Sequence, residues 1–267
     1  MITPICFKLR MYKLRMKQNW KIYSVFCILY SVYSVSAQNV KDSSLFAPMV
    51  KLSYAFQLPG EDLAKRFGYN SNIGLDFSIK TKKNFIFGVS GSFLFGDQIK
   101  EIGILDSLKT SSGFIINQNG NPEVVRLFER GFTISLHVGK IFPVFSSNKN
   151  SGIIAYAGPT FLRHKIKIYD VGKQAAQLVD PYPKGYDRLT AGFGAQEFIG
   201  YIYFGNTRIL NFFFGFEFIQ AFTKSQRSYD YDLMKADTDK RTDLLYGIRV
   251  GWILPLYKKT PQEFYYH

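Results

Sequence analysis

Cysteine and histidine are scarce in this sequence of 267 residues, which has only two cysteines and three histidines. Cys6 and Cys27 fall within an N-terminal segment that we expect to be removed, so the remaining chain would have no disulfide bonds and no thiol chemistry. His137, His164 and His267 are far apart in the sequence and give no metal-ligand spacing. We therefore expect no metal and no other cofactor.

The sequence also lacks the runs of about 20 apolar residues that a bundle of membrane-spanning helices needs. Its most apolar stretch, residues 22–37, follows a basic segment and ends in the small residues Val35, Ser36 and Ala37. This order is typical of a cleavable export signal. We predict a signal peptide over residues 1–37 and a mature chain that starts at Gln38. A membrane anchor is the alternative, but the stretch is short and rich in serine.

The sequence leaves the start codon open between Met1, Met11 and Met16.

Acidic residues are a minority, with 20 Asp and Glu against 34 Lys and Arg. The expected signal peptide holds several of the basic residues, but the rest of the chain remains basic. A basic chain suits nucleic acid, yet an exported protein does not meet it, so we expect no nucleic-acid partner.

Aromatic residues are abundant, at 17% of the chain with 26 Phe and 18 Tyr, and many of them alternate with small or polar residues. In residues 211–222, Phe212, Phe214 and Phe216 share one parity, while Asn211 and Glu217 share the other. This period of two predicts a strand with one apolar and one polar face.

Eight segments have this alternation, and they are residues 49–57, 72–80, 85–96, 132–140, 153–165, 190–203, 211–222 and 244–253. Their second face is mostly Gly, Ser and Thr, which suits a crowded lumen better than a solvated surface. We predict an all-β fold, an eight-stranded antiparallel up-and-down transmembrane β-barrel. A soluble sandwich or lipocalin-like barrel is the alternative. Pro159 and Glu197 interrupt their strands, so we expect a bulge at each.

The connections between these segments alternate in length. Residues 58–71, 97–130, 168–188 and 223–242 are long, and residues 82–84, 146–151 and 205–208 are short. Short periplasmic turns and long extracellular loops are the rule for outer-membrane barrels. Within the mature chain, 38–267, we place the barrel at 48–254 and a periplasmic tail at 255–267. Asn121 and Pro122 predict a short helix over residues 121–130.

Five charged residues should lie on the lumen face of their strands, namely Lys51, Asp76, Arg163, Glu217 and Arg249. An eight-stranded barrel is filled by side chains, so we interpret them as a structural ion-pair network rather than a pore. A proton or ion path is the alternative. The hairpin places Glu217 opposite Ile248 or Arg249, and parity favours a Glu217–Arg249 pair.

Basic residues also gather at the expected periplasmic edge, at Lys80, Lys82, Lys83, Lys140, Lys149, Arg208, Lys258 and Lys259. We interpret this rim as a contact with anionic phospholipid of the inner leaflet or with an acidic periplasmic partner. Ordinary turn composition is the alternative.

Four stretches carry a family resemblance, and they are FQLPGEDLAKRFGYNSNIG, FGVSGSFLFGD, PKGYDRLTAG and YGIRVGWILPLYKKTPQEFYY. Across the mature chain, the sequence resembles small outer-membrane β-barrel proteins of Bacteroidota, the PorT-like barrels in a broad sense. The resemblance implies an outer-membrane location and, from the roles of some members, a part in secretion or envelope assembly. It carries no catalytic motif.

We therefore predict a non-enzymatic outer-membrane barrel that is an accessory or structural component of an envelope complex, with outer-membrane lipid and an envelope protein as its partners. Two alternatives remain open. The first is a lipid A-modifying enzyme, an acyltransferase or deacylase, in which His164 would act with a nearby Ser or Asp. We expect His164 to be a rim residue instead. The second is a ligand- or surface-binding barrel that acts through its long loops.

Overall fold

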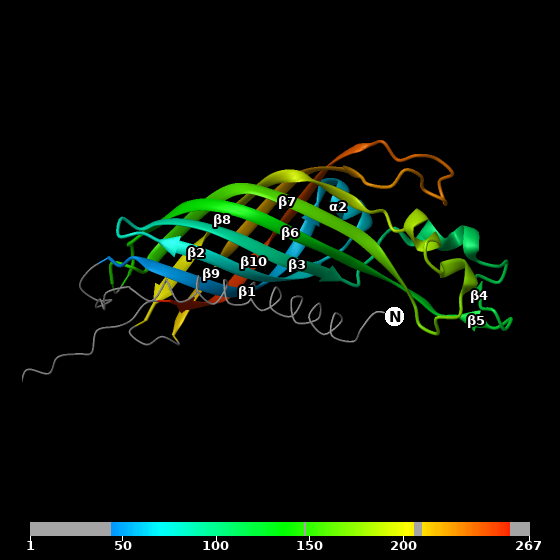
Figure 1. Ribbon diagram of the computed structural model, residues 1–267, viewed down its shortest axis with the longest axis horizontal. Helices are drawn as coiled ribbons and strands as arrows, with labels where there is room; N and C mark the ends of the chain where they lie inside the picture. Colours follow the sequence, from blue (N-terminus) through cyan, green and yellow to red (C-terminus); the bar gives the residue numbers. More distant parts are fainter. Residues whose placement is uncertain (1–43, 147, 206–209, 257–267) are drawn as a thin grey trace, which may run out of the picture. The chain divides into compact units, whose positions relative to one another are not determined.

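A computed structural model of the protein describes residues 44–146, 148–205 and 210–256. Within this part of the chain, the strands of a closed barrel are β1 (Ala47–Gly60), β2 (Asn70–Lys80), β3 (Phe85–Gly96), β6 (Val125–Phe142), β7 (Gly152–Asp170), β8 (Thr190–Phe204), β9 (Asn211–Ser225) and β10 (Lys240–Pro255). Each strand pairs antiparallel with its neighbours in the chain, and β1 pairs with β10 to close the ring (Figure 1). The predicted eight-stranded up-and-down barrel is confirmed.

Side chains alternate between the two faces of every strand. In β9, Phe212, Phe214, Phe216 and Phe218 are 41–58% exposed on the outside, whereas Glu217 is fully buried inside. The outside of the barrel is apolar and the inside largely polar, which is the reverse of a soluble barrel and the arrangement of a barrel that spans a membrane.

The connections divide the barrel into two ends (Figure 1). At the turn end, short connections join β2 to β3, β6 to β7, and β8 to β9. At the loop end, the remaining connections carry α2 (Glu61–Arg66), η1 (Ile102–Leu108), β4 (Ile115–Ile116), β5 (Pro122–Glu123), η2 (Ala176–Leu178) and η3 (Tyr182–Gly185). The β6–β7 connection starts at residue 143 and is longer than predicted. The side chain of Asn148 closes this connection, because its Oδ1 accepts hydrogen bonds from the backbone N–H groups of Asn150 and Ser151, each at 2.9 Å.

The helix predicted over residues 121–130 is wrong. Pro122 and Glu123 form β5, which pairs with β4, and Val125 begins β6. The alternation of β6 extends to this point, because Glu129 is buried whereas Arg126 is exposed. The period of two in the strand therefore outweighs the Asn-Pro signal for a helix start.

The two predicted bulges are also absent. β8 pairs with β9 in one unbroken register that passes through Glu197↔Phe218. Between β6 and β7, pairing lapses beside Pro159, which has no N–H to donate, and resumes in the same register. Pro159 and Glu197 both simply face outward.

The barrel interior is filled at both ends by apolar side chains. The turn-end plug consists of buried residues that are at most 2% exposed, namely Met49, Ile86, Ile141, Ile154, Ile202, Phe204 and Ile253. At the loop end, Leu63 and Phe67 from the α2 region pack on Leu94, Leu162 and Leu245 of the barrel wall. A layer of polar side chains lies between these two plugs.

A pair of glycines lets β8 and β9 come together beneath an aromatic ring. Gly200 and Gly215 lie opposite each other in the ladder. A Cβ atom at Gly215 would lie 2.5 Å from the Cα of Gly200 and 2.7 Å from the ring of Phe198. Both distances are too short for a side chain, so glycine is required there.

Candidate functional site

Glu217 lies at the centre of the polar layer and accepts four hydrogen bonds. Arg249 donates two of them, from Nε to Oε1 and from Nη2 to Oε2, both at 2.8 Å. Gln196 and Gln57 donate the other two, at 2.6 and 2.8 Å. The bidentate pair and both amides saturate the carboxylate, so its charge is tolerated although the side chain is fully buried.

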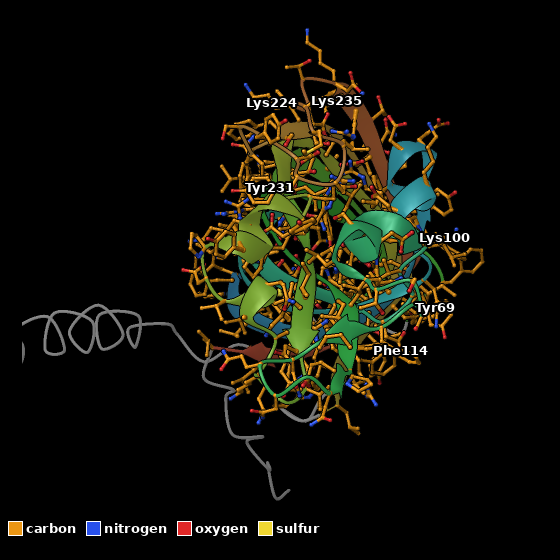
Figure 2. All side chains as sticks on the ribbon, turned by 90° about the vertical axis from the view of Figure 1, so that its right-hand side faces the viewer. Tyr69, Lys100, Phe114, Lys224, Tyr231 and Lys235 are labelled. Carbon is orange, nitrogen blue, oxygen red and sulfur yellow. The ribbon has the colours of Figure 1, made fainter. Side chains whose placement is uncertain are left out.

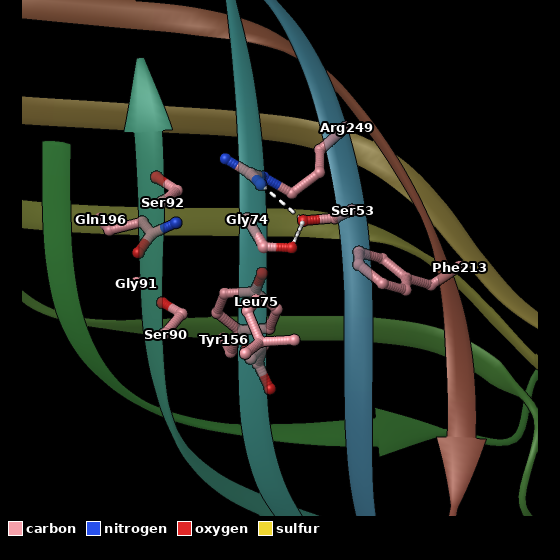
Figure 3. Close-up of a pocket in the computed structure, with 11 residues that line it drawn as sticks. Ser53, Gly74, Leu75, Ser90, Gly91, Ser92, Tyr156, Gln196, Phe213 and Arg249 are labelled. Atoms are coloured by element: carbon pink, nitrogen blue, oxygen red, sulfur yellow. Dashed lines mark hydrogen bonds between the residues drawn. The ribbon is translucent and has the colours of Figure 1, made fainter. Parts of the chain in front are cut away.

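Arg249 carries the network on to other strands. Its Nη1 donates to Ser53 at 2.7 Å, as Figure 3 shows, and its Nη2 donates to Asn72 at 2.9 Å. Asn72 in turn donates to Ser92, whose hydroxyl lies 2.6 Å from that of Thr133. The chain of hydrogen bonds thus links seven strands of the barrel, from β8 through to β6.

A second charged group lies on the turn side of this network. Lys51 Nζ is 3.4 Å from Asp76 Oδ1, and His137 Nε2 is 3.3 Å from the other oxygen of Asp76. The Lys51 ammonium also lies 5.7 Å from the ring centroids of both Tyr156 and Phe213. A cavity of about 20 Å³, room for about one water molecule, remains between the two charged groups (Figure 3).

Of the five charges predicted for the lumen, Lys51, Asp76, Glu217 and Arg249 face inward, and Arg163 does not. Arg163 is exposed on the outer face of β7, because its neighbours His164 and Leu162 fill the interior. The predicted register was also wrong. Glu217 lies opposite Gly247 and Arg249 opposite Gly215, so the ion pair runs diagonally between the strands.

His164 is not the rim residue that the sequence led us to expect. It is 2% exposed and faces inward, with Nε2 2.9 Å from Asp243 Oδ2. The same carboxylate oxygen accepts a hydrogen bond from Thr223, and the Phe67 ring covers the imidazole edge-on at 5.5 Å. We overlooked Asp243, although it shares the inward parity of Arg249 in β10.

An ion-pair cluster ties the loops together above the barrel. The Arg188 guanidinium binds Glu101, Asp230 and Asp232, and Arg66 binds Glu101 and Asp237. Burial opposes the charge of Arg188, but its hydrogen bonds to Asp232 and Glu101 outweigh this effect and raise its pKa. Burial dominates at Arg66 and lowers its pKa. These contacts join the β1–β2, β3–β6, β7–β8 and β9–β10 connections.

The predicted basic rim at the turn end is only partly a surface feature. Lys80 is wrong as a rim residue, because it is 1% exposed and donates inward to Leu45 O and to Asn150 Oδ1, at 3.1 and 2.8 Å. The other described members are exposed, and they are Lys82, Lys83, Lys140 and Lys149. Arg208, Lys258 and Lys259 lie outside the described residues, as do Cys6, Cys27, His267, the predicted signal peptide 1–37 and nearly all of the tail 255–267.

Glu197 is an acidic side chain on the apolar outer wall. It is the central residue of β8, where its neighbours across the ladders are Ala157 and Phe218. Ala155 and Ala157 leave room around it, so that Glu197 lines an open hollow of about 460 Å³ together with Ile199 and Phe218. Among the described residues of the eight barrel strands, it is the one carboxylate that faces outward.

Among the described residues, no group of three or more His, Cys, Asp and Glu side chains could hold a metal ion. No helix in that part of the chain is long and apolar enough to cross a membrane.

Comparison with known proteins gives only distant matches. No protein-family model matches the sequence, and no curated protein is significantly similar to it. The similar solved structures include Ail, the attachment invasion locus protein of Yersinia pestis, which was crystallised with the heparin analogue sucrose octasulfate. It is 11% identical with a TM-score of 0.34, over 78% of this chain and 99% of Ail. The outer membrane protein OprG from Pseudomonas aeruginosa is 11% identical with a TM-score of 0.39, over 81% of this chain and 99% of OprG.

Proposed function

We propose that this protein is a non-enzymatic barrel of the outer membrane and an accessory or structural component of an envelope secretion or assembly complex, of the PorT-like kind. In this proposal, residues 1–37 are a cleaved signal peptide, the loop end faces outward from the cell and the turn end faces the periplasm.

The surface supports insertion into lipid. The outer faces of all the barrel strands are dominated by Phe, Leu, Ile, Val and Tyr, many of them 40–60% exposed, for example Leu75 at 59% and Phe216 at 58%. So large an apolar surface is unstable in water and favourable in a bilayer.

The interior supports a structural role rather than transport. Glu217 and Arg249 bind each other, as do Lys51 and Asp76, and apolar plugs fill the barrel on both sides of them. His164, the residue that a lipid A-modifying enzyme would use, points inward beneath Phe67 and away from lipid. Asp243 therefore serves to give the buried imidazole of His164 a hydrogen-bond partner.

The observation that carries the proposal is Glu197. An ionisable side chain on a lipid-facing wall is costly, and such residues mark functional sites. The alanine-lined hollow beside it leaves space for a second protein surface. We infer that the occupant is a transmembrane segment of a partner protein, which places a cationic or hydrogen-bond-donating side chain against Glu197.

Filling the hollow tests this proposal. Ala157→Trp should abolish stoichiometric co-purification of the partner in mild detergent, because the indole occupies the docking space. Leu75→Trp on β2, four strands away around the ring, is the matched control and should retain the partner. Glu197→Gln should weaken the association less than Ala157→Trp does. A wild-type barrel that purifies alone, or an Ala157→Trp barrel that keeps its partner, would contradict the proposal.

A second candidate function, binding of a ligand or surface by the loops, is favoured by the aromatic and apolar side chains that they expose. Phe114 is 54% exposed, Tyr69 49% and Tyr231 40%, and all three lie on the loop face of the molecule (Figure 2). Replacing the three by serine should then abolish binding to the target surface without altering the co-purified partner.

A further inference from the structure

Basic side chains cluster on the outer wall of the barrel at its loop end. We call them the basic belt, and its members are Arg126 and Arg130 of β6, Arg163, Lys165 and Lys167 of β7, Lys224 of β9 and Lys240 of β10. All of them have the outward parity of their strands, and all are exposed or half-exposed. The described parts of β1, β2 and β3 have no outward-facing Lys or Arg, so the belt covers one side of the barrel.

The strand register brings the members of the belt side by side. Arg163 and Lys224 both lie opposite Ala191 of β8, one on each side, and Lys224 lies opposite Lys240. Adjacent strands are about 4.8 Å apart, so Arg163 and Lys224 are roughly 10 Å apart across the small Ala191. Ala191 between them is only 7% exposed, so the row is a continuous positively charged strip.

The belt is poorly neutralised by the protein itself. Lys165 lies 3.6 Å from Asp187, but that carboxylate already binds Arg227 through two hydrogen bonds. Within the described part of the chain, the side chains of Arg126, Arg163, Lys167, Lys224 and Lys240 form no ion pair. Lys224 and Lys240 face each other directly, as do Arg130 and Lys165. Like charges at such positions are destabilising, so an external anion would stabilise the sheet.

An aromatic row lies directly on the membrane side of the belt. Phe161, Phe193 and Phe222 pair across β7, β8 and β9, two residues nearer to the turn end than Arg163, Ala191 and Lys224. Phe193 and Phe222 are each 73% exposed, and the Phe161 and Phe193 rings are 5.1 Å apart. Cations above an aromatic row fit an amphiphile that has an anionic headgroup above its acyl chains.

We propose that the basic belt binds the phosphate groups of a phosphorylated glycolipid of the lipid A class in the outer leaflet, while its acyl chains lie on Phe161, Phe193 and Phe222. This inference rests on the proposed outer-membrane location. Arg163 and Lys224 supply the charge-assisted hydrogen bonds to phosphate from the two sides of Ala191. Lys224 lies at the margin of the loop face, where such a headgroup would reach it (Figure 2).

The test compares two triple variants of the full-length barrel in detergent micelles. The belt variant is Arg163→Gln with Lys224→Gln and Lys240→Gln. The control is Lys82→Gln with Lys83→Gln and Lys149→Gln, which removes the same charge at exposed positions of the turn end. The probes are phosphorylated lipid A, dephosphorylated lipid A, phosphatidylglycerol and inorganic phosphate, and binding is measured by native mass spectrometry.

Wild-type protein should bind phosphorylated lipid A more tightly than the other three probes. Each removed charge should weaken binding by about fivefold, which is on the order of 100-fold for the belt variant. The control should bind as wild type does. The belt variant should fold, because it removes the Lys224–Lys240 repulsion, and the heat-resistant band on unboiled gels checks this.

Three outcomes would overturn the inference. They are equal binding by wild type and the belt variant, equal loss in the turn-end control, and equal wild-type affinity for phosphorylated and dephosphorylated lipid A. Tighter binding of phosphatidylglycerol or of free phosphate would overturn the assignment to glycolipid. The comparisons between lipid A, dephosphorylated lipid A, phosphatidylglycerol and phosphate use the wild-type protein alone. Fractionation of the protein outside the outer membrane would contradict the proposed location instead, and it is measured separately in cells.

Discussion

At the scale of single residues, the interior of this barrel depends on how completely its charges are hydrogen-bonded. Glu217 receives four donors, and the guanidinium of Arg249 is divided among Glu217, Ser53 and Asn72. A buried charge that loses its partner retains the full cost of desolvation, so the two side chains are far more interdependent than an exposed pair would be.

We predict that Glu217→Ala destabilises the folded barrel by about 3–5 kcal/mol, because it leaves Arg249 charged and uncompensated. The urea midpoint of tryptophan fluorescence in lipid vesicles measures this loss. Gln220→Ala, on the outer face of the same strand, is the control and should change the midpoint little. Glu217→Arg and Arg249→Glu should each weaken the heat-resistant band on unboiled gels.

Combining the two reversals should restore much of that band, because the amides of Gln57 and Gln196 can rotate to offer oxygen to an arginine at position 217. Single reversals that leave the band unchanged would show that the pair contributes nothing to folding.

The sequence indicates this pair because parity alone places Glu217 and Arg249 inside. It does not indicate the register, since a shift by one or two residues depends on where the β9–β10 loop closes. It misplaced Arg163 for a related reason. β7 passes Pro159 without the expected bulge, so Arg163 keeps the outward parity of Ala157 and Pro159.

At the scale of elements, the strands were predictable and their loop-side ends were not. Period-two alternation identifies all eight barrel strands, but β6 and β7 continue well beyond the predicted limits, to Val125 and Asp170. In these extensions Arg126, Arg130 and Lys167 alternate with Phe128 and Tyr169 on the outer face, so a search for alternating hydrophobicity stops too early. These extensions hold three of the seven residues of the basic belt, and Lys224 and Lys240 also lie beyond the predicted strand limits, so the sequence did not reveal the belt.

The order of the loops depends on ionised carboxylates. The pKa values of two of them, Asp237 and Asp230, are shifted in opposite directions. Burial opposes the charge of Asp237, but the hydrogen bond and charge of Arg241, the backbone N–H of Asp239 and the charge of Arg66 together outweigh it and hold the Asp237 pKa below its usual 3.8. Asp237 therefore stabilises the folded loops above about pH 4, and this contribution is lost as the pH falls through its lowered pKa. Burial raises the Asp230 pKa, although Arg188 opposes the shift. The charge of Asp230 is thus a cost at neutral pH.

We predict that Asp237→Asn loosens the β9–β10 loop at pH 7, whereas Asp230→Asn leaves it unchanged or tightens it. Hydrogen–deuterium exchange of residues 226–239, normalised to an unfolded peptide at each pH, measures both effects. In the wild type, the same loop should lose protection only below the ordinary aspartate range. Equal loosening in the two variants at pH 7 would refute the assignment of opposite signs.

At the scale of the whole molecule, the arrangement is a polar and ion-paired interior inside an apolar wall. Apolar side chains also close both ends of the lumen, so the polar layer is isolated from the two aqueous phases. Outside, the wall has a basic belt at one end, exposed lysines such as Lys82 and Lys149 at the other, and Glu197 in the middle. A bilayer, and a partner protein within it, would contact the basic belt, the turn-end lysines and Glu197. The packed and ion-paired interior holds the strands that carry these residues in place.

The orientation of the whole molecule gives the last prediction. Ser112 lies exposed in the β3–β6 loop, and Lys82 lies exposed in the β2–β3 turn at the opposite end. If the mature chain lacks Cys6 and Cys27, Ser112→Cys and Lys82→Cys each introduce a single thiol. Asn148 would be a poor labelling position at the turn end, because its side chain holds the β6–β7 connection and donates to Phe204 O at 2.9 Å. A membrane-impermeant maleimide should label Ser112→Cys on intact cells and Lys82→Cys only after the outer membrane is permeabilised. If only Lys82→Cys is labelled on intact cells, the proposed orientation is wrong. The basic belt would then contact the inner leaflet and not the outer one.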